Sequence, residues 1–281
     1  MPDAFAHCEA LLRASDKDRF LSALFAPAEH RSALHALYAF NVEVTRVREL
    51  VKEPLAGEIR LQWWREALAG ERREEARGHP VAAALVQVIS KYSLPLVLFD
   101  ELIEARRFDL GSELMGSIEE VEHYARRTSS SLIELAARIL DRDGGAPSIA
   151  GPAGVSLGVT GLLRLLPLDA ARGRLFIPAD LLGRHGIVPQ DIFAGRSSNG
   201  LTAALADMRN LAAGHYRQAR ALAAGAGQRS IAAWLPAALV PLHLRALERG
   251  EREPFRSVEV PQWRRQWALW RTARAGRLGP L

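Results

Sequence analysis

The amino-acid sequence predicts an all-α fold. Apolar residues recur at three- and four-residue spacing along most of the chain, whereas runs of period-two alternation are short and few. The composition, 48% hydrophobic and 25% charged residues, is that of a soluble globular protein with enough apolar side chains for a core. No composition shift or long linker divides the chain, so we expect one domain over residues 1–281, with about ten helices.

The periodic stretches give the helices in order. A continuous apolar stripe predicts a helix over 29–51, and Pro54 follows it. The run GEIRLQWWREALAG indicates a helix near 56–69 that stops at Gly70, and Gly78-His79-Pro80 breaks the chain again. Further helices are expected at 81–92, 95–108, 118–140, 152–166, 202–224, 230–248 and 261–274. The clearest loops are expected at 141–146, 194–200 and 249–254.

Four glycines lie on one face of the helix expected at 152–166. Gly151, Gly154, Gly158 and Gly161 are spaced by three, four and three residues. Each costs a helix up to about 1 kcal/mol relative to alanine, so something must offset the cost. Close packing of a neighbouring helix and a cavity lining explain the pattern equally well. Pro167 is expected to kink or end this helix.

The cysteine count, the N-terminal sequence and the apolar runs argue against a secreted or membrane-spanning protein. Cys8 is the single cysteine, the N-terminus does not read as a secretory signal, and no apolar run reaches the length of a spanning helix. We therefore expect a cytoplasmic protein, at most bound to the inner face of a membrane. The net charge of +5 is interpreted first as a basic surface. Zinc-ligand, RNA-binding and helix-turn-helix patterns are missing, and no nucleic-acid partner is expected.

Several short motifs follow one another in a recognisable order. They are YAF at 38–40, the Arg/Trp-rich run 60–65, His79-Pro80-Val81, Phe108-Asp109-Leu110, GRLFIPADLLGRHGI at 173–187 and His215-Tyr216. Together they resemble the squalene/phytoene synthase family over roughly residues 10–250. The resemblance implies an isoprenoid synthase-like helical bundle around a central cavity, with residues 255–281 as a C-terminal basic helix.

The resemblance also implies a chemistry. Active members join two prenyl diphosphates head to head. Two Asp-x-x-x-Asp motifs on facing helices hold Mg²⁺, which neutralises the departing diphosphate. An i, i+4 spacing puts both carboxylates of a motif on one helix face.

This sequence departs from both motifs. Counted from YAF, the first motif falls at 45–49, where Thr45 replaces an aspartate and Glu49 remains; counted back from Gly173-Arg174, the second falls at 165–169, where Leu165 replaces an aspartate and Asp169 remains. Arg46 and Arg48 would repel a nearby cation, but they are also suited to binding a phosphate. The resemblance implies a cavity or substrate site made of Tyr38, Asn41, Thr45, Arg46, Gly158, Gly161, Leu165 and Arg174.

The segments around both motifs are similar to one branch of the family. That branch contains the mitochondrial assembly factor of respiratory complex I (NADH:ubiquinone oxidoreductase) and its α-proteobacterial relatives. The first hypothesis is therefore a non-catalytic protein without a cofactor, which acts in complex I assembly or binds a prenyl lipid. Its partners would be respiratory-complex subunits or a prenyl lipid or diphosphate.

The alternative hypothesis is an active Mg²⁺-dependent prenyltransferase, in which Glu49 and Asp169 share a reduced metal site. A third hypothesis is a protein that carries a prenyl lipid without converting it.

Three further features are more typical of packing or of a protein surface than of a functional site. Trp263, Trp267 and Trp270 share a helix face among arginines, and we expect them to pack onto the domain, with contact to a membrane surface as the alternative. Asp109 with Arg106 and Arg107 is expected to form a surface ion pair, with an ion pair at the edge of the cavity as the alternative. Ser129, Ser130 and Ser131 are expected to serve packing, because no serine-nucleophile motif surrounds them.

Overall fold

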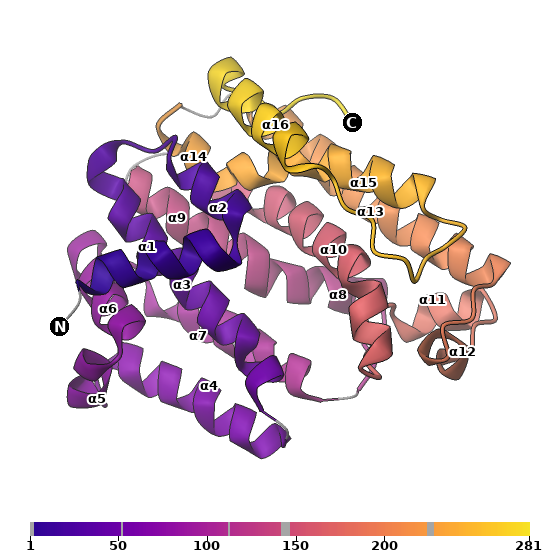
Figure 1. Cartoon of the computed structure of the whole chain (residues 1–281), viewed down its shortest axis with the longest axis horizontal. Helices are drawn as coiled ribbons and strands as arrows, with labels where there is room; N and C mark the ends of the chain where they lie inside the picture. The colour runs from indigo at the N-terminus through magenta and orange to yellow at the C-terminus, as the bar shows by residue number, and fades with distance from the viewer. Residues whose placement is uncertain (1–2, 52, 112, 142–146, 224–227) are drawn as a thin grey trace.

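The computed structural model describes residues 3–51, 53–111, 113–141, 147–223 and 228–281. Every regular element within these ranges is a helix, which confirms the predicted all-α fold (Figure 1). The helices gather around two adjoining hydrophobic cores, one in the N-terminal half and one in the C-terminal half.

The N-terminal core surrounds a long central helix, α3 (Ala28–Leu50), which confirms the helix predicted at 29–51. The ring of Phe40 packs edge-on against Trp64 and Phe99, with ring centroids 5.2 and 5.5 Å away. Two helices that the periodicity did not reveal precede α3: α1 (Ala4–Ser15) and α2 (Lys17–Ala23). Both begin at an aspartate whose side chain accepts a hydrogen bond from a backbone N–H of the first turn, Asp3 for α1 and Asp16 for α2.

The helices α4 to α7 cover the other side of α3, in the lower left of Figure 1. They are α4 (Pro54–Ala69), α5 (Arg73–Gly78), α6 (Pro80–Tyr92) and α7 (Leu96–Arg107). Gly70 ends α4 as predicted, in a left-handed conformation with φ of 85° that favours glycine. The short α5 was not predicted, because only Ala76 of its residues is buried and it has no apolar stripe.

The helix predicted at 118–140 is interrupted. It consists of α8 (Ile118–Ala125), the π-helical turn η2 (Arg126–Ser130) and α9 (Ser131–Leu140). In the turn, the Ser130 hydroxyl donates to the carbonyl of Gly151 and the Ser131 hydroxyl donates to that of Arg126, at 2.8 and 3.2 Å. The serines thus serve packing and local hydrogen bonding, as expected.

The glycine-bearing helix α10 (Pro147–Ala171) is longer than predicted. Of the two outcomes expected at Pro167, a kink or an end of the helix, the end does not occur. Its last turns stay helical because Leu166 and Ala170 are buried in the C-terminal core, which offsets the lost backbone hydrogen bond. The stretch Ser148–Ala171 is long and apolar enough to cross a membrane, yet 61% of its most apolar window is buried inside the protein. A central core helix has the same properties.

Both interpretations of the glycine face hold, each for part of it. A methyl group on Gly154 would overlap the backbone and hydroxyl of Ser130, so this glycine permits close packing of η2. A methyl group on Gly161 would meet nothing within 4 Å, and Gly158 and Gly161 both line a cavity.

The C-terminal half packs against α10 (Figure 1, right). The long α13 (Asn199–Ala223) agrees with the prediction at 202–224, of which residue 224 lies outside the described residues, and α16 (Gln262–Ala275) agrees with that at 261–274. The helix expected at 230–248 is divided into α14 (Ile231–Trp234), the 3₁₀ turn η4 (Leu235–Leu239) and α15 (Val240–Arg249), because Pro236 and Pro241 each remove a backbone donor.

Short elements complete the chain. The turn η1 (Phe108–Leu110) extends α7, whereas α11 (Ala179–Arg184) and α12 (Pro189–Phe193) were not predicted because they are single turns. Of the predicted loops, Asn199 and Gly200 belong to α13, Gly250–Pro254 is a loop, and residues 142–146 lie outside the described residues.

Candidate functional site

A cavity of about 650 Å³ lies between the two cores. Its walls come from the start of α2, the second half of α3, η2, the middle of α10, η4 and the neighbouring turns of α15 and α16. The same long helices that build the cores therefore fix its shape.

Most of the residues predicted from the sequence line this cavity. They are Asn41, Thr45, Arg46, Glu49, Gly158, Gly161 and Leu165. Leu165 is 39% exposed, so the position of the missing aspartate faces solvent inside the cavity. The buried hydroxyl of Thr45 has no hydrogen-bond partner among the described residues.

Three predicted residues lie outside the lining. Tyr38 is buried in the core, where burial raises the pKa of its phenol and no described group bonds its hydroxyl. Asp169 is buried one turn beyond the last lining residue of α10, and Arg174 lies beside it. The placement of Tyr38 and Arg174 in the cavity was therefore wrong: α3 turns Tyr38 toward the core, and Arg174 follows the end of α10 back onto Asp169.

Each carboxylate at the two positions where the resemblance implies a motif faces an arginine. The Arg172 guanidinium donates a hydrogen bond to the Glu49 carboxylate at 3.2 Å. Asp169 has two cationic neighbours, the Arg48 guanidinium at 3.4 Å and the Arg174 guanidinium at 3.7 Å. The two facing helices are thus joined by arginine–carboxylate pairs at the places where the resemblance implies metal ligands.

Asp169 is 1% exposed, and burial raises the pKa of its carboxyl, whereas Arg48 and Arg174 act to lower it. Neither carboxylate oxygen makes a hydrogen bond among the described residues. The arginines therefore compensate the charge of Asp169 electrostatically rather than through close hydrogen bonds.

No three His, Cys, Asp or Glu side chains come together as a metal-binding group in the described part of the chain. A Mg²⁺ ion needs oxygen ligands in octahedral geometry, and a guanidinium beside each carboxylate competes with it for the same oxygens. The donor set around Glu49 and Asp169 does not fit a magnesium cluster.

The cavity carries an excess of positive charge. Its basic side chains are Lys17, Arg19, Arg46, Arg48, Arg106, Arg164 and Arg265, and its carboxylates are Asp16, Asp18 and Glu49. All three carboxylates are paired, Asp16 with Arg19 at 2.5 Å, Asp18 with Arg265 at 2.6 Å and Glu49 with Arg172 at 3.2 Å.

The pKa values of Arg164 and His243 are lowered chiefly by burial, and nearby cations add to the shift. Burial, together with the nearby Arg265, lowers the pKa of Arg164, although Asp18 opposes the shift. Burial, then Arg164 and Arg265, lower the pKa of His243 to about 3. An anion in the cavity would reduce this repulsion between like charges.

A buried polar network forms part of the cavity wall. The prediction of a surface ion pair at Asp109 is wrong, and the alternative, an ion pair with Arg106 at the edge of the cavity, agrees with the structure. Asp109 is 3% exposed; its carboxylate accepts hydrogen bonds from Arg106 at 3.1 Å and from the Tyr124 hydroxyl at 2.7 Å. Arg106 also donates to Tyr124 at 2.8 Å. Arg107 points elsewhere and pairs with Glu104 and Glu58.

Some cavity residues were missed from the sequence. Arg164 and Tyr124 belong to no motif, and nothing in their spacing marks them. Asp16 and Asp18 lie at the start of α2. Aspartates at such a position are typical of a helix cap, but they do not show that this part of the chain faces α10. An ion pair of Asp109 was predicted, but its burial was not, because the turn η1 folds the side chain inward.

The tryptophans of α16 do not pack onto the protein as expected. Trp263, Trp267 and Trp270 are 64%, 58% and 44% exposed, while Leu269 and Thr272 form the inner face of the helix. The packing interpretation is therefore wrong for this face.

The chain is similar to known proteins both in sequence and in fold. The family model described as squalene/phytoene synthase matches residues 12–271. Complex I assembly factor 6 of Rattus norvegicus is 27% identical over 280 residues, covering 95% of this chain and 84% of that protein. A phytoene synthase of Thermus thermophilus is 28% identical over 213 residues, covering 74% and 71%. A crystal structure of a dehydrosqualene synthase superimposes with a TM-score of 0.82 at 18% identity, covering 97% of this chain and 95% of that one.

Proposed function

The chain belongs to the squalene/phytoene synthase family, and on that premise we propose that it is a non-catalytic member that acts in the assembly of respiratory complex I. We further propose that its cavity binds the phosphate of a prenyl lipid through arginines, without Mg²⁺. The observation that carries the proposal is the pairing of Arg172 with Glu49 and of Arg48 with Asp169.

This pairing argues against prenyl transfer on chemical grounds. Ionisation of a prenyl diphosphate separates an allylic cation from a multiply charged anion, and Mg²⁺ stabilises that anion as a Lewis acid. A guanidinium binds phosphate by bidentate hydrogen bonds but does not coordinate it as a metal ion does. An arginine-lined cavity is thus suited to holding a phosphorylated lipid, and less suited to breaking its C–O bond.

The role in assembly is supported by the relatives. The protein of Rattus norvegicus that matches 95% of this chain is named as an assembly factor of NADH dehydrogenase (ubiquinone) complex I. The corresponding role here would place the protein beside a membrane complex, and we propose the cytoplasmic face of that membrane as its location.

The first experiment tests catalysis. Purified protein is incubated with farnesyl or geranylgeranyl diphosphate and Mg²⁺, and the extract is analysed by mass spectrometry, with the Thermus thermophilus phytoene synthase as positive control. We expect no C30 or C40 product. A product that Asp169→Ala abolishes would establish the Mg²⁺-dependent prenyltransferase instead.

The second experiment tests metal-free binding. Isothermal titration with geranylgeranyl diphosphate in excess EDTA is expected to show binding, because the cavity supplies cations itself. Arg164→Gln and Arg46→Gln should weaken it, whereas Arg77→Gln, on the exposed outer helix α5, should not. Binding that appears only with added Mg²⁺ would contradict the proposal.

The third experiment tests the role in assembly. The gene is deleted in the organism that encodes it, and NADH:ubiquinone oxidoreductase activity is measured in isolated membranes. We expect a loss of assembled complex that the wild-type gene and the Glu49→Gln variant, which changes an exposed pair, both restore. Unchanged complex I in the deletion strain would remove this part of the proposal.

A further inference from the structure

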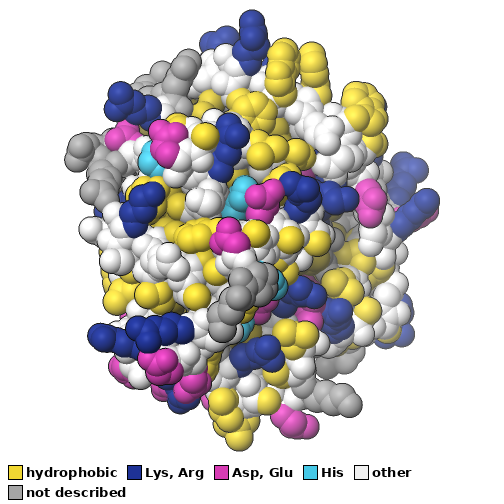
Figure 2. All heavy atoms as spheres, turned by 60° about the vertical axis from the view of Figure 1, so that its left-hand side comes forward, with side chains coloured by type: hydrophobic (Ala, Val, Ile, Leu, Met, Phe, Trp, Pro, Cys, Tyr) yellow, Lys and Arg dark blue, Asp and Glu magenta, His cyan; other side chains and the backbone are white. Residues whose placement is uncertain are grey.

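One face of α16 combines exposed aromatic rings with unopposed basic side chains. The α16 face consists of Trp263, Trp267 and Trp270 with Arg264, Arg271 and Arg274. The helix contains no Asp or Glu. Figure 2 shows hydrophobic and basic side chains next to one another over the top of the molecule, the end at which Figure 1 places α16.

The rings and cations of this face are held together. Trp267 and Trp270 stack with ring centroids 4.9 Å apart, while the guanidinium groups of Arg264 and Arg274 lie over Trp263 and Trp270, at 5.2 and 5.9 Å from the centroids. On the inner side, buried Leu269 and Thr272 hold α16 on the protein. The aromatic rings are therefore presented to the outside by a fixed helix.

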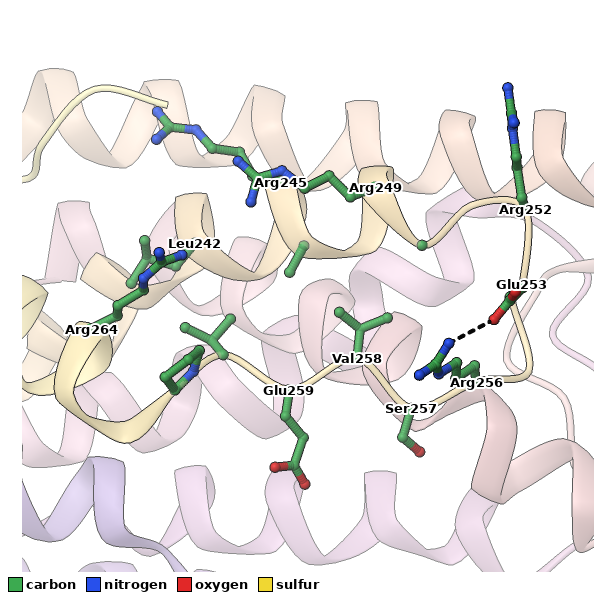
Figure 3. A pocket seen from close by; sticks show the side chains of 14 residues that line it. Leu242, Arg245, Arg249, Arg252, Glu253, Arg256, Ser257, Val258, Glu259 and Arg264 are labelled. Carbon is green, nitrogen blue, oxygen red and sulfur yellow. Dashed lines mark hydrogen bonds and ion pairs between the residues drawn. The ribbon is translucent and has the colours of Figure 1, made fainter.

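A basic groove continues the α16 face. It has a volume of about 660 Å³ and lies between α15 and the segment 251–261 (Figure 3). Its lining includes Arg245, Arg249, Arg252, Arg256 and Arg264, against Glu253 and Glu259. Arg264 belongs to both surfaces, which makes them continuous.

The two glutamates do not neutralise the groove. Glu253 pairs with Arg256 at 3.2 Å, and Glu259 points away from Arg245 and Arg249 in Figure 3. Among the described residues, Arg256 is the groove arginine with a carboxylate partner. The remaining four guanidinium groups are available to anions from outside.

We propose that the α16 face and this groove bind the surface of a bilayer that contains anionic phospholipids. Tryptophan favours the membrane–water interface, where its ring is buried among lipid and its N–H stays near water. Arginines near a bilayer are attracted to anionic headgroups and bind phosphate oxygens directly. Exposed tryptophans with excess positive charge on both flanking surfaces match that interface better than they match an acidic peptide, which would leave the rings unburied.

This inference goes beyond the proposed function and does not depend on it. A membrane-bound protein can be catalytic or not, and the residues that line the cavity do not include the tryptophans of α16. Vesicle binding and prenyl transfer are measured separately, so one can fail without the other.

The experiment is co-sedimentation of the full chain with vesicles. One set is phosphatidylcholine alone and the other contains about one third phosphatidylglycerol. We expect binding to the anionic vesicles, with a blue shift of tryptophan emission, and weak binding to phosphatidylcholine. Raising NaCl to about 0.5 M should weaken binding to the anionic vesicles.

Variants locate the binding surface. Trp267→Ser with Trp270→Ser should weaken vesicle binding about tenfold, because both rings lose their apolar contact. Arg249→Gln and Arg252→Gln should each weaken it about fivefold. The matched controls are Val97→Ser, 57% exposed on α7, and Arg77→Gln on α5, far from α16 in Figure 1; both should bind like the wild type.

Circular dichroism and the melting temperature show that each variant is folded, and light scattering gives its oligomeric state. Equal binding to neutral and anionic vesicles, or equal loss in the controls, would overturn the proposal. It would also be overturned by a concentration-dependent dimer that the tryptophan variant dissociates, since the face would then be covered by a second copy. Binding to an acidic protein without binding to vesicles would be equally decisive against it.

Discussion

The Arg48 guanidinium lies 3.4 Å from the Asp169 carboxylate, and both side chains are more than nine-tenths buried. A positive side chain from α3 therefore reaches the second motif position on α10. The pair replaces, within the protein, the compensation that an external cation gives a buried carboxylate.

Breaking this pair is expected to destabilise the protein. Arg48→Met leaves Asp169 with only the more distant Arg174, and we expect the free energy of unfolding to fall by about 3 kcal/mol. Arg48→Met with Asp169→Asn should recover part of the loss, because the buried charge is then gone. Denaturant unfolding measures both. Arg77→Met, in a pair whose two side chains are more than 70% exposed, should change stability by less than about 0.5 kcal/mol.

Restoring the motif carboxylates is expected to create a metal site. Thr45 and Leu165 line the cavity, so Thr45→Asp with Leu165→Asp would place two new carboxylates there, each four residues before a surviving one. Calorimetry with inorganic diphosphate should then show Mg²⁺-dependent binding that the wild type lacks. Thr45→Asn with Leu165→Asn, of the same shape without charge, is the control. Mg²⁺-independent behaviour in the aspartate variant would show that Arg48 and Arg172 still compete with the metal for Asp169 and Glu49.

The same substitution, glycine to alanine, is expected to have opposite effects on stability at two positions of α10. Gly154→Ala should lower the melting temperature and cost about 1–3 kcal/mol, because the new methyl group overlaps the Ser130 backbone. Gly161→Ala meets open space in the cavity and should gain up to about 1 kcal/mol from helix propensity. Similar losses at both positions would mean that the cavity beside Gly161 is filled.

Two buried tyrosines allow a second comparison, between a hydroxyl that has a hydrogen-bond partner and one that has none among the described residues. Tyr124→Phe removes a donor to the Asp109 carboxylate and should cost about 2 kcal/mol. Tyr38→Phe removes a buried hydroxyl that has no partner among the described residues, so the free energy of unfolding should stay the same or rise. Chemical denaturation measures the free energy of unfolding of both variants. An equal loss in the two would show that the Tyr38 hydroxyl has a hydrogen-bond partner.

His243 gives the pH dependence of stability a defined window. Its pKa is about 3 in the folded protein and near 6.5 in an unfolded chain, so between these values the unfolded state binds more protons. Stability should therefore fall by about 1 kcal/mol per pH unit on acidification below pH 6.5, with no contribution above it. His243→Gln should flatten the slope of unfolding free energy against pH.

The sequence pattern predicted the long helices well, because each buries a continuous apolar stripe. The helix at 29–51 was found within one residue, since Ala33 to Val47 contact the core all along it. The short helices α5, α11 and α12 were missed, because one or two turns show no period. Pro167 does not end its helix, since burial of Leu166 and Ala170 outweighs its local cost.

The candidate site was predicted in part. Counting from YAF and from Gly173-Arg174 found Thr45, Glu49 and Leu165, which line one cavity. The arginine that faces each carboxylate was not predicted, since Arg48 and Arg172 are far from their partners in sequence. Spacing identifies which residues share a helix face, but it does not show which face of another helix lies opposite.

The π-helical turn Arg126–Ser130 accommodates one extra residue between α8 and α9. A π-turn holds one residue more than the α-helical path between the same ends, so it is equivalent to a single-residue insertion. Deleting one residue there would let α8 and α9 merge into a regular helix, and Leu132, Leu135 and Ile139 would keep their places in the core. The deletion would instead change the turn itself, where Ser130 lies against Gly154. The extra residue therefore matters for the local contact between η2 and α10 rather than for the packing of α9.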